Sequence, residues 1–482
     1  MSFQFVDNSD INNRARKLIR SHVMKGRNSG KTRTKRTKSV EPTADKSLIA
    51  HGTRAAPSNN VEPLIMAPGD TRCKDSILAV TRRVANDLSL LSPIKNMSPQ
   101  TIFHIRQLAF YILDIASPPE YCHTSPITEW MWFKLTFSNE AYFHCTCGMA
   151  FACAAFMTED NSHSPVALQH MSQAYRLINK QLSSNEALSD STIAVVAAIN
   201  VYDRLYGDPQ KAMIHHNGLT SIIALRGGIR ELAKRNFAIA EKTMRSDVEL
   251  ALHCRSTPRF SSLDIPRHLL LIDTEHHSER GRHKEAELIA STLYQSSCAK
   301  LRNVVYDVLC LSKILSQASL TKKLDAAAYQ NTLLYIGYRL LETEILPSDL
   351  EPNTSLNALI RLAMIGFQNT FCFGIGRKLV VFPPLVEDFR SVAQVVSAES
   401  VSHKMIVLWA LLMGKVSSLT EGIDDHWLVP KVKTLAGELQ FRTWSEVSDA
   451  LRPFPWVKVT HEAQGEAFWN TIFAQPRLVT NT

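Results

Sequence analysis

The feature that most constrains the fold is a helical spacing of apolar residues, which governs most of the chain after Cys73. In residues 99–116, which begin at Pro99, one face of a helix would carry Ile102, Ile105, Leu108, Ala109, Ile112 and Leu113. The same period returns in residues 76–91, 141–157, 165–182 and 190–207. Alternation typical of strands is almost absent, and only the short run "RKLVVF" suggests a strand. The sequence therefore predicts an all-α fold.

The helical part of the chain, residues 73–482, shows no repeat of fixed period, so we expect an irregular multi-helix bundle or array. Residues 255–287 are rich in proline, serine, histidine and charge, and we expect an internal loop there. After it, apolar spacing predicts helices near residues 288–316, 323–345, 355–370, 401–420 and 430–450. The longest apolar stretch, residues 405–414, is shorter than the roughly 18 residues of a membrane span. No membrane is therefore expected as a partner.

Positive charge is concentrated near the N-terminus. The chain of 482 residues has a formal charge of +9, and residues 1–72 hold 14 Lys/Arg against 6 Asp/Glu. Between Arg14 and Lys38 there are 11 basic residues and no acidic residue. Such a block repels itself, stays solvated and attracts polyanions or import receptors. We therefore expect residues 1–72 to form a disordered basic arm and linker, with a purely solubilising tail as the alternative.

Within this basic arm, residues 11–25 combine helical apolar spacing with basic residues, after a plausible N-cap at Ser9. A helix this short is marginal alone and would form fully only on binding a partner. The arm can neutralise DNA phosphates without reading sequence, or serve as a nuclear import signal. The residues predicted to act in one of these ways are Arg14, Arg16, Lys17, Arg20, Lys25, Arg27, Lys31, Arg33, Lys35, Arg36 and Lys38.

No catalytic motif is present. The stretch "GRNSGKT" at residues 26–32 looks like a phosphate-binding loop, but it has one residue too few between its glycines. It also lacks the buried strand that precedes such a loop. The sequence contains no G-x-S-x-G, no Rossmann glycine pattern and no H-E-x-x-H. We therefore name no catalytic residue and no cofactor, and an enzyme of unknown type is the least favoured interpretation.

Several potential metal ligands, His144, Cys145, Cys147 and Cys153, lie close together in the sequence. Structural thiolate sites generally use cysteine pairs presented by turns, whereas this segment reads as one continuous helix of small residues. We expect these thiols to be ordinary core residues and predict no metal site. The nine cysteines of the chain have no regular spacing, which favours reduced thiols over a disulfide framework.

The most specific segment is "AMIHHNGLTSIIALRGGIREL", residues 212–232. It resembles a signature, H-x-x-G-L followed by R-G-G, in the helical regulatory domain of fungal-specific transcription factors. The matching residues are His215, Gly218, Leu219, Arg226, Gly227 and Gly228. The resemblance covers about residues 120–260. A glycine pair after a helix is a C-cap signal, so we expect a helix–turn–helix corner with a positive φ at one of the glycines.

This resemblance implies a nuclear protein that regulates transcription, often of metabolic gene clusters, together with other transcription regulators. The family reads DNA through a six-cysteine zinc cluster opening with C-x2-C-x6-C, and this sequence has no such pattern. We therefore expect no base recognition by a zinc cluster. The protein could reach promoters in two ways. The basic arm could bind DNA non-specifically, or a partner protein with its own DNA-binding domain could recruit this protein. The alternative function is a helical protein-interaction scaffold without DNA contact.

Overall fold

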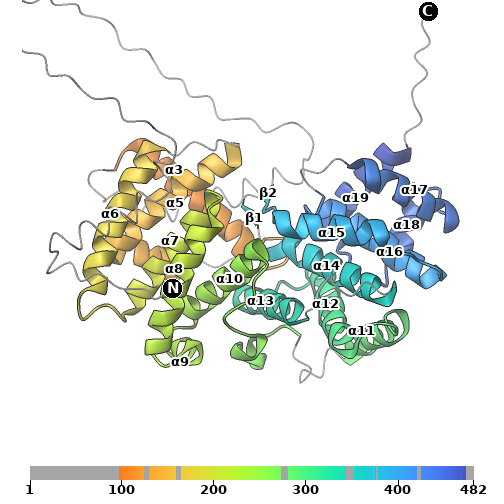
Figure 1. The fold of residues 1–482 in the computed structure, drawn as a ribbon, viewed down its shortest axis with the longest axis horizontal. Helices are drawn as coiled ribbons and strands as arrows, with labels where there is room; N and C mark the ends of the chain where they lie inside the picture. Colours follow the sequence, from red (N-terminus) through yellow and green to blue (C-terminus); the bar gives the residue numbers. More distant parts are fainter. Residues whose placement is uncertain are drawn as a thin grey trace, which may run out of the picture. The chain divides into compact units, whose positions relative to one another are not determined.

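The structure is a computed structural model, which describes residues 97–123, 130–158, 164–272, 280–343, 352–372, 374–375, 378–420 and 425–473. The basic arm, its expected helix at residues 11–25 and the helix expected at residues 76–91 lie outside these ranges. The described residues confirm the all-α fold, because they form seventeen α-helices and a single pair of two-residue strands (Figure 1).

The first group of helices surrounds α5. Its members are α3 (Pro99–Ala116), α4 (Met131–Ser138), α5 (Glu140–Thr158), α6 (Pro165–Leu182), α7 (Asp190–Leu205), α8 (Pro209–Leu225), α9 (Ile229–Arg235) and α10 (Phe237–Cys254). Helix α5 packs against α3, α4, α6 and α7, so four helices cover it. The face predicted for α3 is largely confirmed, since Ile105, Leu108, Ala109 and Leu113 are buried.

Helix α5 is long and apolar enough to cross a membrane, which the sequence analysis did not anticipate. Its burial accounts for this composition, because Cys145, Cys147 and Cys153 are all buried and the four neighbouring helices enclose it. Burial raises the pKa of each of these three thiols to about 12. The thiols are therefore protonated at neutral pH, which fits small core residues.

The second group of helices surrounds α14 and α16. It comprises η4 (Ser262–Asp264), η5 (Arg267–Leu269), α11 (Arg280–Leu293), α12 (Ala299–Ala318), α13 (Ala326–Glu342), α14 (Pro352–Cys372), α15 (Pro383–Val395), α16 (Val401–Val416), η7 (Asp425–Trp427), α17 (Leu428–Glu438), α18 (Trp444–Ala450) and α19 (Lys458–Phe473). Helix α14 packs against α12, α13, α15 and α16, and α16 also contacts α17 and α19.

The two groups meet along α10, which contacts α7, α8 and α9 on one side and α13 and α15 on the other. In Figure 1, α10 lies between the yellow helices of the first group and the blue helices of the second. A residue on α10 can therefore touch segments that lie far apart in the sequence. The buried residues of the two groups form one continuous hydrophobic core.

Local side-chain caps explain where many of these helices begin. Ser98, Ser189, Asp208, Asp325 and Ser400 each accept a hydrogen bond from a backbone N–H in the first turn of the helix that follows. A side-chain oxygen at this position satisfies one of the N–H groups that have no partner within the helix. Proline follows the cap in α3 and α8, where its missing N–H costs nothing.

Several predicted boundaries in the second half differ from the structure. The helix expected near 288–316 is two helices, α11 and α12, because the serine-rich turn before Cys298 interrupts it. Helix α11 begins at Arg280, inside the loop expected at 255–287, and that segment also contains η4 and η5. The helix expected near 430–450 is also two helices, α17 and α18. Gln440 between them has a φ of 62°, and Thr443 with Glu446 forms a capping box that starts α18.

The run that suggested a strand forms only a minimal one. Strand β2 (Lys378–Leu379) pairs antiparallel with β1 (Gly374–Ile375), with Gly374 opposite Leu379. Two helices of the second group, α15 and α19, were not predicted. In α19 the buried residues His461, Gly465, Phe468 and Trp469 do recur at helical spacing.

Candidate functional site

The family signature builds the corner between α8 and α9. Gly227 and Gly228 both have a φ of 93°, which confirms the expected positive φ. Their N–H groups donate to the carbonyl oxygens of Ala224 at 3.1 Å and Ile223 at 2.9 Å. These bonds satisfy carbonyls that the end of α8 leaves without a helical partner, and Gly228 is then the N-cap of α9. We refer to Arg226, Gly227 and Gly228 as the RGG corner.

His215 attaches α8 to α7 through a buried carboxylate. Its Nδ1 lies 2.6 Å from Oδ2 of Asp203, whose residue is only 2% exposed. Lys211 Nζ lies 2.9 Å from the other oxygen, and both residues pack near the ring of Tyr175. Burial opposes the charge on Lys211, but the Asp203 carboxylate outweighs it, so the pKa of Lys211 is raised. The acid is thus shared between two groups on α8.

The other signature residues have different roles. Arg226 forms an ion pair with Asp190 at the start of α7, and the second oxygen of Asp190 accepts from Nδ2 of Asn236 at 2.9 Å. Leu219 is fully buried. Gly218 is exposed within α8 and has no atom within 4 Å of where a Cβ would stand. Nothing in the structure explains why this position is glycine. The signature as a whole joins helices, with no arrangement that would perform chemistry.

Replacing either glycine of the RGG corner by valine should lower the free energy of unfolding by about 1 kcal/mol or more. A β-branched residue is strained at the φ of 93° found at both positions. Gly218→Ala is the matched control, because this glycine is helical and uncrowded, so alanine should be neutral or slightly stabilising. Urea titration of the purified chain measures all three variants. Unchanged midpoints for both valine variants would contradict the role of the corner.

The carboxylate of Asp247 on α10 accepts hydrogen bonds from several segments of the chain. The sequence analysis did not identify this residue. His216 donates from Nε2 to its Oδ1 at 2.9 Å, and the backbone N–H groups of Arg259 and Phe260 donate at 2.9 and 3.0 Å. The hydroxyl of Tyr338 on α13 lies 3.1 Å from Oδ2 and 2.9 Å from the carbonyl oxygen of Met244, so its proton is shared between these two acceptors. Asp247 is 2% exposed, so one buried carboxylate joins α8, α10, α13 and the segment after α10.

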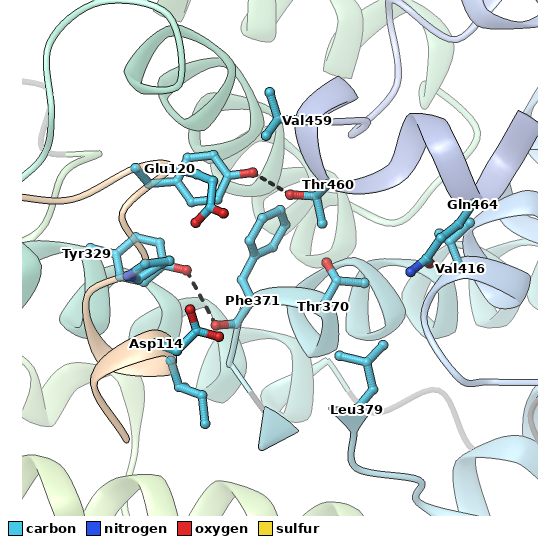
Figure 2. Close-up of a pocket in the computed structure, with 13 residues that line it drawn as sticks. Asp114, Glu120, Tyr329, Thr370, Phe371, Leu379, Val416, Val459, Thr460 and Gln464 are labelled. Carbon is cyan, nitrogen blue, oxygen red and sulfur yellow. Dashed lines mark hydrogen bonds between the residues drawn. The ribbon is translucent and has the colours of Figure 1, made fainter. Parts of the chain in front are cut away.

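A cleft of about 200 Å³ lies where the end of α3 meets α13, α14 and α19. Figure 2 shows the ring of Phe371 among its lining side chains, with the carboxylates of Asp114 and Glu120 to one side and Thr460 to the other. The hydroxyl of Tyr329 donates to the carbonyl of Phe371 at 3.4 Å. Among the described residues, the lining contains no histidine, cysteine, lysine or arginine. The volume is below the roughly 300–1,000 Å³ of ligand pockets.

Beside this cleft, Thr370 and His461 lie 3.0 Å apart and look like a nucleophile and its base. The hydrogen bonds show that His461 donates to the hydroxyl of Thr370, whereas a base would accept its proton. Nδ1 of His461 accepts from the N–H of Val457 at 3.0 Å, and burial lowers the pKa of this imidazole to about 3. A neutral ring with Nδ1 as the acceptor carries its proton on Nε2, so it donates to Thr370. Thr370 in turn donates to the carbonyl of Phe367 at 2.7 Å. This pair therefore does not activate a nucleophile.

A larger cavity, of about 330 Å³, lies between α3, α4, α5, α7 and α10. We call it the α5–α10 cavity. Its wall is mainly apolar and aromatic, and includes Tyr111, Trp130, Trp132, Met131 and Met149. Its volume lies within the usual range for small-molecule pockets, which combine an apolar wall with a few convergent polar groups.

Five charged residues line the α5–α10 cavity, all from α7 and α10. Arg204 forms an ion pair with Glu249, and Arg245 forms one with Glu241 at 2.8 Å. Lys242 Nζ donates to the hydroxyl of Tyr142 at 2.7 Å and lies 5.1 Å from the centre of that ring. Burial, reinforced by the neighbouring Arg245, lowers the pKa of Arg204, so the cations of this cavity repel one another.

Two buried donors in the wall of this cavity have no acceptor within the described ranges, namely Nε1 of Trp132 and Nε of Arg204. Buried polar atoms without a partner are uncommon in proteins. A neighbouring hollow of about 700 Å³ adjoins the cavity, and the residues common to both linings are Val201, Arg204, Leu205, Glu249 and Val380.

Residues 111–262, which carry all the corner residues and most of the cavity wall, match the model of the fungal specific transcription factor domain. This match confirms the resemblance seen at residues 212–232. No curated protein and no solved structure matches the chain. The family match indicates a role in transcriptional regulation.

The predicted residues and the charged groups of the α5–α10 cavity do not coincide. The basic residues from Arg14 to Lys38 lie outside the described residues, so their role stays a prediction. The signature residues lie together at α8 and its corner, apart from the cavity. In the sequence, Glu241, Arg245 and Glu249 alternate in sign at spacings of four, which usually indicates a solvated helix face. That pattern could not reveal that these residues enclose a cavity.

Proposed function

We propose that this protein is a nuclear regulator of transcription whose targets include the genes of a metabolic cluster. The family match over residues 111–262 carries the proposal, since the domain belongs to fungal transcription factors. The basic arm supports it, because 11 Lys/Arg without an acid between Arg14 and Lys38 suit both DNA phosphates and an import receptor.

Two routes to promoters remain part of this proposal. The basic arm can hold the protein on DNA through phosphates, which provides affinity without sequence preference. A partner protein's DNA-binding domain can instead recruit the helical body, and the absence of a C-x2-C-x6-C pattern from this sequence makes this route an equal rival. Either route requires contacts with other transcription regulators, because phosphate contacts alone do not select promoters.

Chromatin occupancy of the tagged protein should be confined to a limited set of promoters, and should fall when residues 11–38 are deleted. The deletion also removes the expected import signal, so the deleted form should carry an added import signal that restores its nuclear concentration. Occupancy maps of the two forms, taken at equal nuclear levels, measure the contribution of the arm to DNA contact.

The outcomes separate the two routes from the alternative. Loss of promoter occupancy in the deletion supports the arm on DNA, whereas unchanged occupancy supports recruitment by a partner. Occupancy no higher than that of an unrelated nuclear protein would overturn the proposal. The protein would then be a helical scaffold without DNA contact.

A further inference from the structure

The α5–α10 cavity has the size and the wall of a small-molecule site. Its volume of about 330 Å³ is partly open to solvent and lies mainly between five helices, with Gln330 of α13 and Cys372 of α14 also in the lining. Aromatic and thioether side chains make up much of its wall. Protein interiors are otherwise packed as tightly as organic crystals, so voids larger than a water molecule are few. An apolar body of modest size would be covered on most sides by Tyr111, Trp130, Trp132 and Met149.

The charge of the lining is not balanced. Arg204, Lys242 and Arg245 are opposed by two carboxylates, those of Glu241 and Glu249, which leaves one positive charge. Both carboxylates are engaged by the arginines. Lys242 has a phenol hydroxyl and an aromatic ring as its contacts, and forms no ion pair with a carboxylate in the described part of the chain. Lys242 is therefore the cation to which an anion could be added.

The ammonium of Lys242 has three N–H donors, and one of them goes to the hydroxyl of Tyr142 at 2.7 Å. A carboxylate accepts several hydrogen bonds through its two oxygens, so it can use the other donors of Lys242. We propose that the α5–α10 cavity binds a small organic acid, with its carboxylate at Lys242 and its apolar body against the aromatic wall. This binding site stands apart from the proposed role in transcription.

The expected preference follows from the charge. A hydrogen bond between a charged donor and a charged acceptor is about twice as strong as one between neutral groups. An acid should therefore bind about ten-fold more tightly than the alcohol of the same shape. The corresponding amine should bind more weakly than the alcohol, because its charge is repelled by the surplus positive charge of the lining.

Isothermal titration calorimetry of the purified full chain tests this order with three probes that share one apolar body. The probes are 4-phenylbutanoate, 4-phenylbutan-1-ol and 4-phenylbutylammonium. The expected order of affinity is acid, alcohol, amine. The emission of Trp130 and Trp132 should change on binding, because both side chains line the cavity.

Two substitutions locate the probe. Lys242→Met should abolish the preference for the acid over the alcohol, whereas Lys242→Arg should keep it. Ala238→Trp should weaken the binding of all the probes, because Ala238 is exposed and lines the cavity, so a larger side chain can obstruct it without disturbing the core.

Two controls separate charge from structure. Tyr142→Phe removes the hydroxyl that Lys242 contacts but keeps the cation, so the preference for the acid should remain. Lys180→Met removes an exposed lysine of α6 outside the cavity, and should leave all affinities unchanged. Circular dichroism verifies that each variant is folded before titration.

Three results would overturn the inference. The first is no heat of binding for 4-phenylbutanoate at millimolar concentration. The second is an alcohol that binds the wild type as tightly as the acid. The third is an acid affinity that Lys242→Met and Ala238→Trp both leave unchanged, which would place the probe elsewhere. None of these measurements depends on DNA or on gene expression, so the inference can fail while the proposed function stands.

Discussion

Replacing Asp247 by alanine should lower the free energy of unfolding by about 3–5 kcal/mol. The carboxylate is buried and accepts from the imidazole of His216, from the backbone N–H groups of Arg259 and Phe260, and from the hydroxyl of Tyr338. Alanine would leave His216 and the N–H groups of Arg259 and Phe260 without this acceptor, whereas the hydroxyl of Tyr338 keeps the carbonyl of Met244 at 2.9 Å. A buried donor without a partner keeps its full desolvation cost. Urea titration followed by circular dichroism measures the loss.

Two variants make this test specific. Asp247→Asn keeps the shape but removes the charge and one acceptor oxygen, so its loss should be smaller than that of alanine. Asp449→Ala breaks an exposed ion pair with Arg452, in which the two side chains are 58% and 74% exposed, and should cost less than about 1 kcal/mol. A loss for Asp247→Ala no larger than for Asp449→Ala would show that the buried network does not stabilise the domain.

The affinity of the full chain for duplex DNA should fall roughly 250- to 1,000-fold between 50 and 200 mM salt, if the basic arm contacts DNA. Four to six phosphate contacts give a slope of log K against log salt of about −4 to −5, because each contact contributes about −0.9. Affinity should differ little among DNA sequences, since phosphates carry no base information. Fluorescence anisotropy over a salt series measures the slope.

The matched variant replaces six basic residues by alanine, namely Arg14, Arg16, Lys17, Arg20, Lys25 and Arg27. It should lose the steep slope together with most of the affinity. A peptide of residues 8–38 should also gain helical circular dichroism on addition of DNA, because so short a helix is marginal alone. A slope near zero, or no binding at low salt, would rule out the arm as a DNA contact. Recruitment to promoters by a partner's DNA-binding domain would then be the remaining explanation.

Much of the helical fold could be predicted from short stretches of the sequence. Helices α5, α6 and α7 lie within one or two residues of the ranges expected, because apolar spacing and a serine cap or an initial proline act within a few residues. The predicted helix boundaries were wrong at α11–α12 and at α17–α18. In both places a short polar turn interrupts an apolar pattern that continues on both sides. Periodicity alone does not distinguish such a turn from a polar helix face.

The candidate site was less predictable than the fold. The glycines of the RGG corner were found because a positive φ needs glycine, and this requirement is local. Asp247 was not found, since its partners come from α8, from α13 and from the segment after α10. Cys147 is two residues from Cys145 and so lies on another face of α5, yet both are fully buried because helices cover α5 on several sides.

The sequence by itself determined the helical class, many helix starts, the corner at Gly227 and Gly228, and the family match over residues 111–262. These depend on backbone preferences and spacing, which act over a few residues. Only the tertiary structure decided which charged residues are buried. Lys242 becomes part of a cavity because Tyr142, a hundred positions earlier, lies against it, and Arg245 because Gln330 of α13 does. Such burial depends on contacts between segments that are distant in the sequence, and local sequence patterns do not predict these contacts.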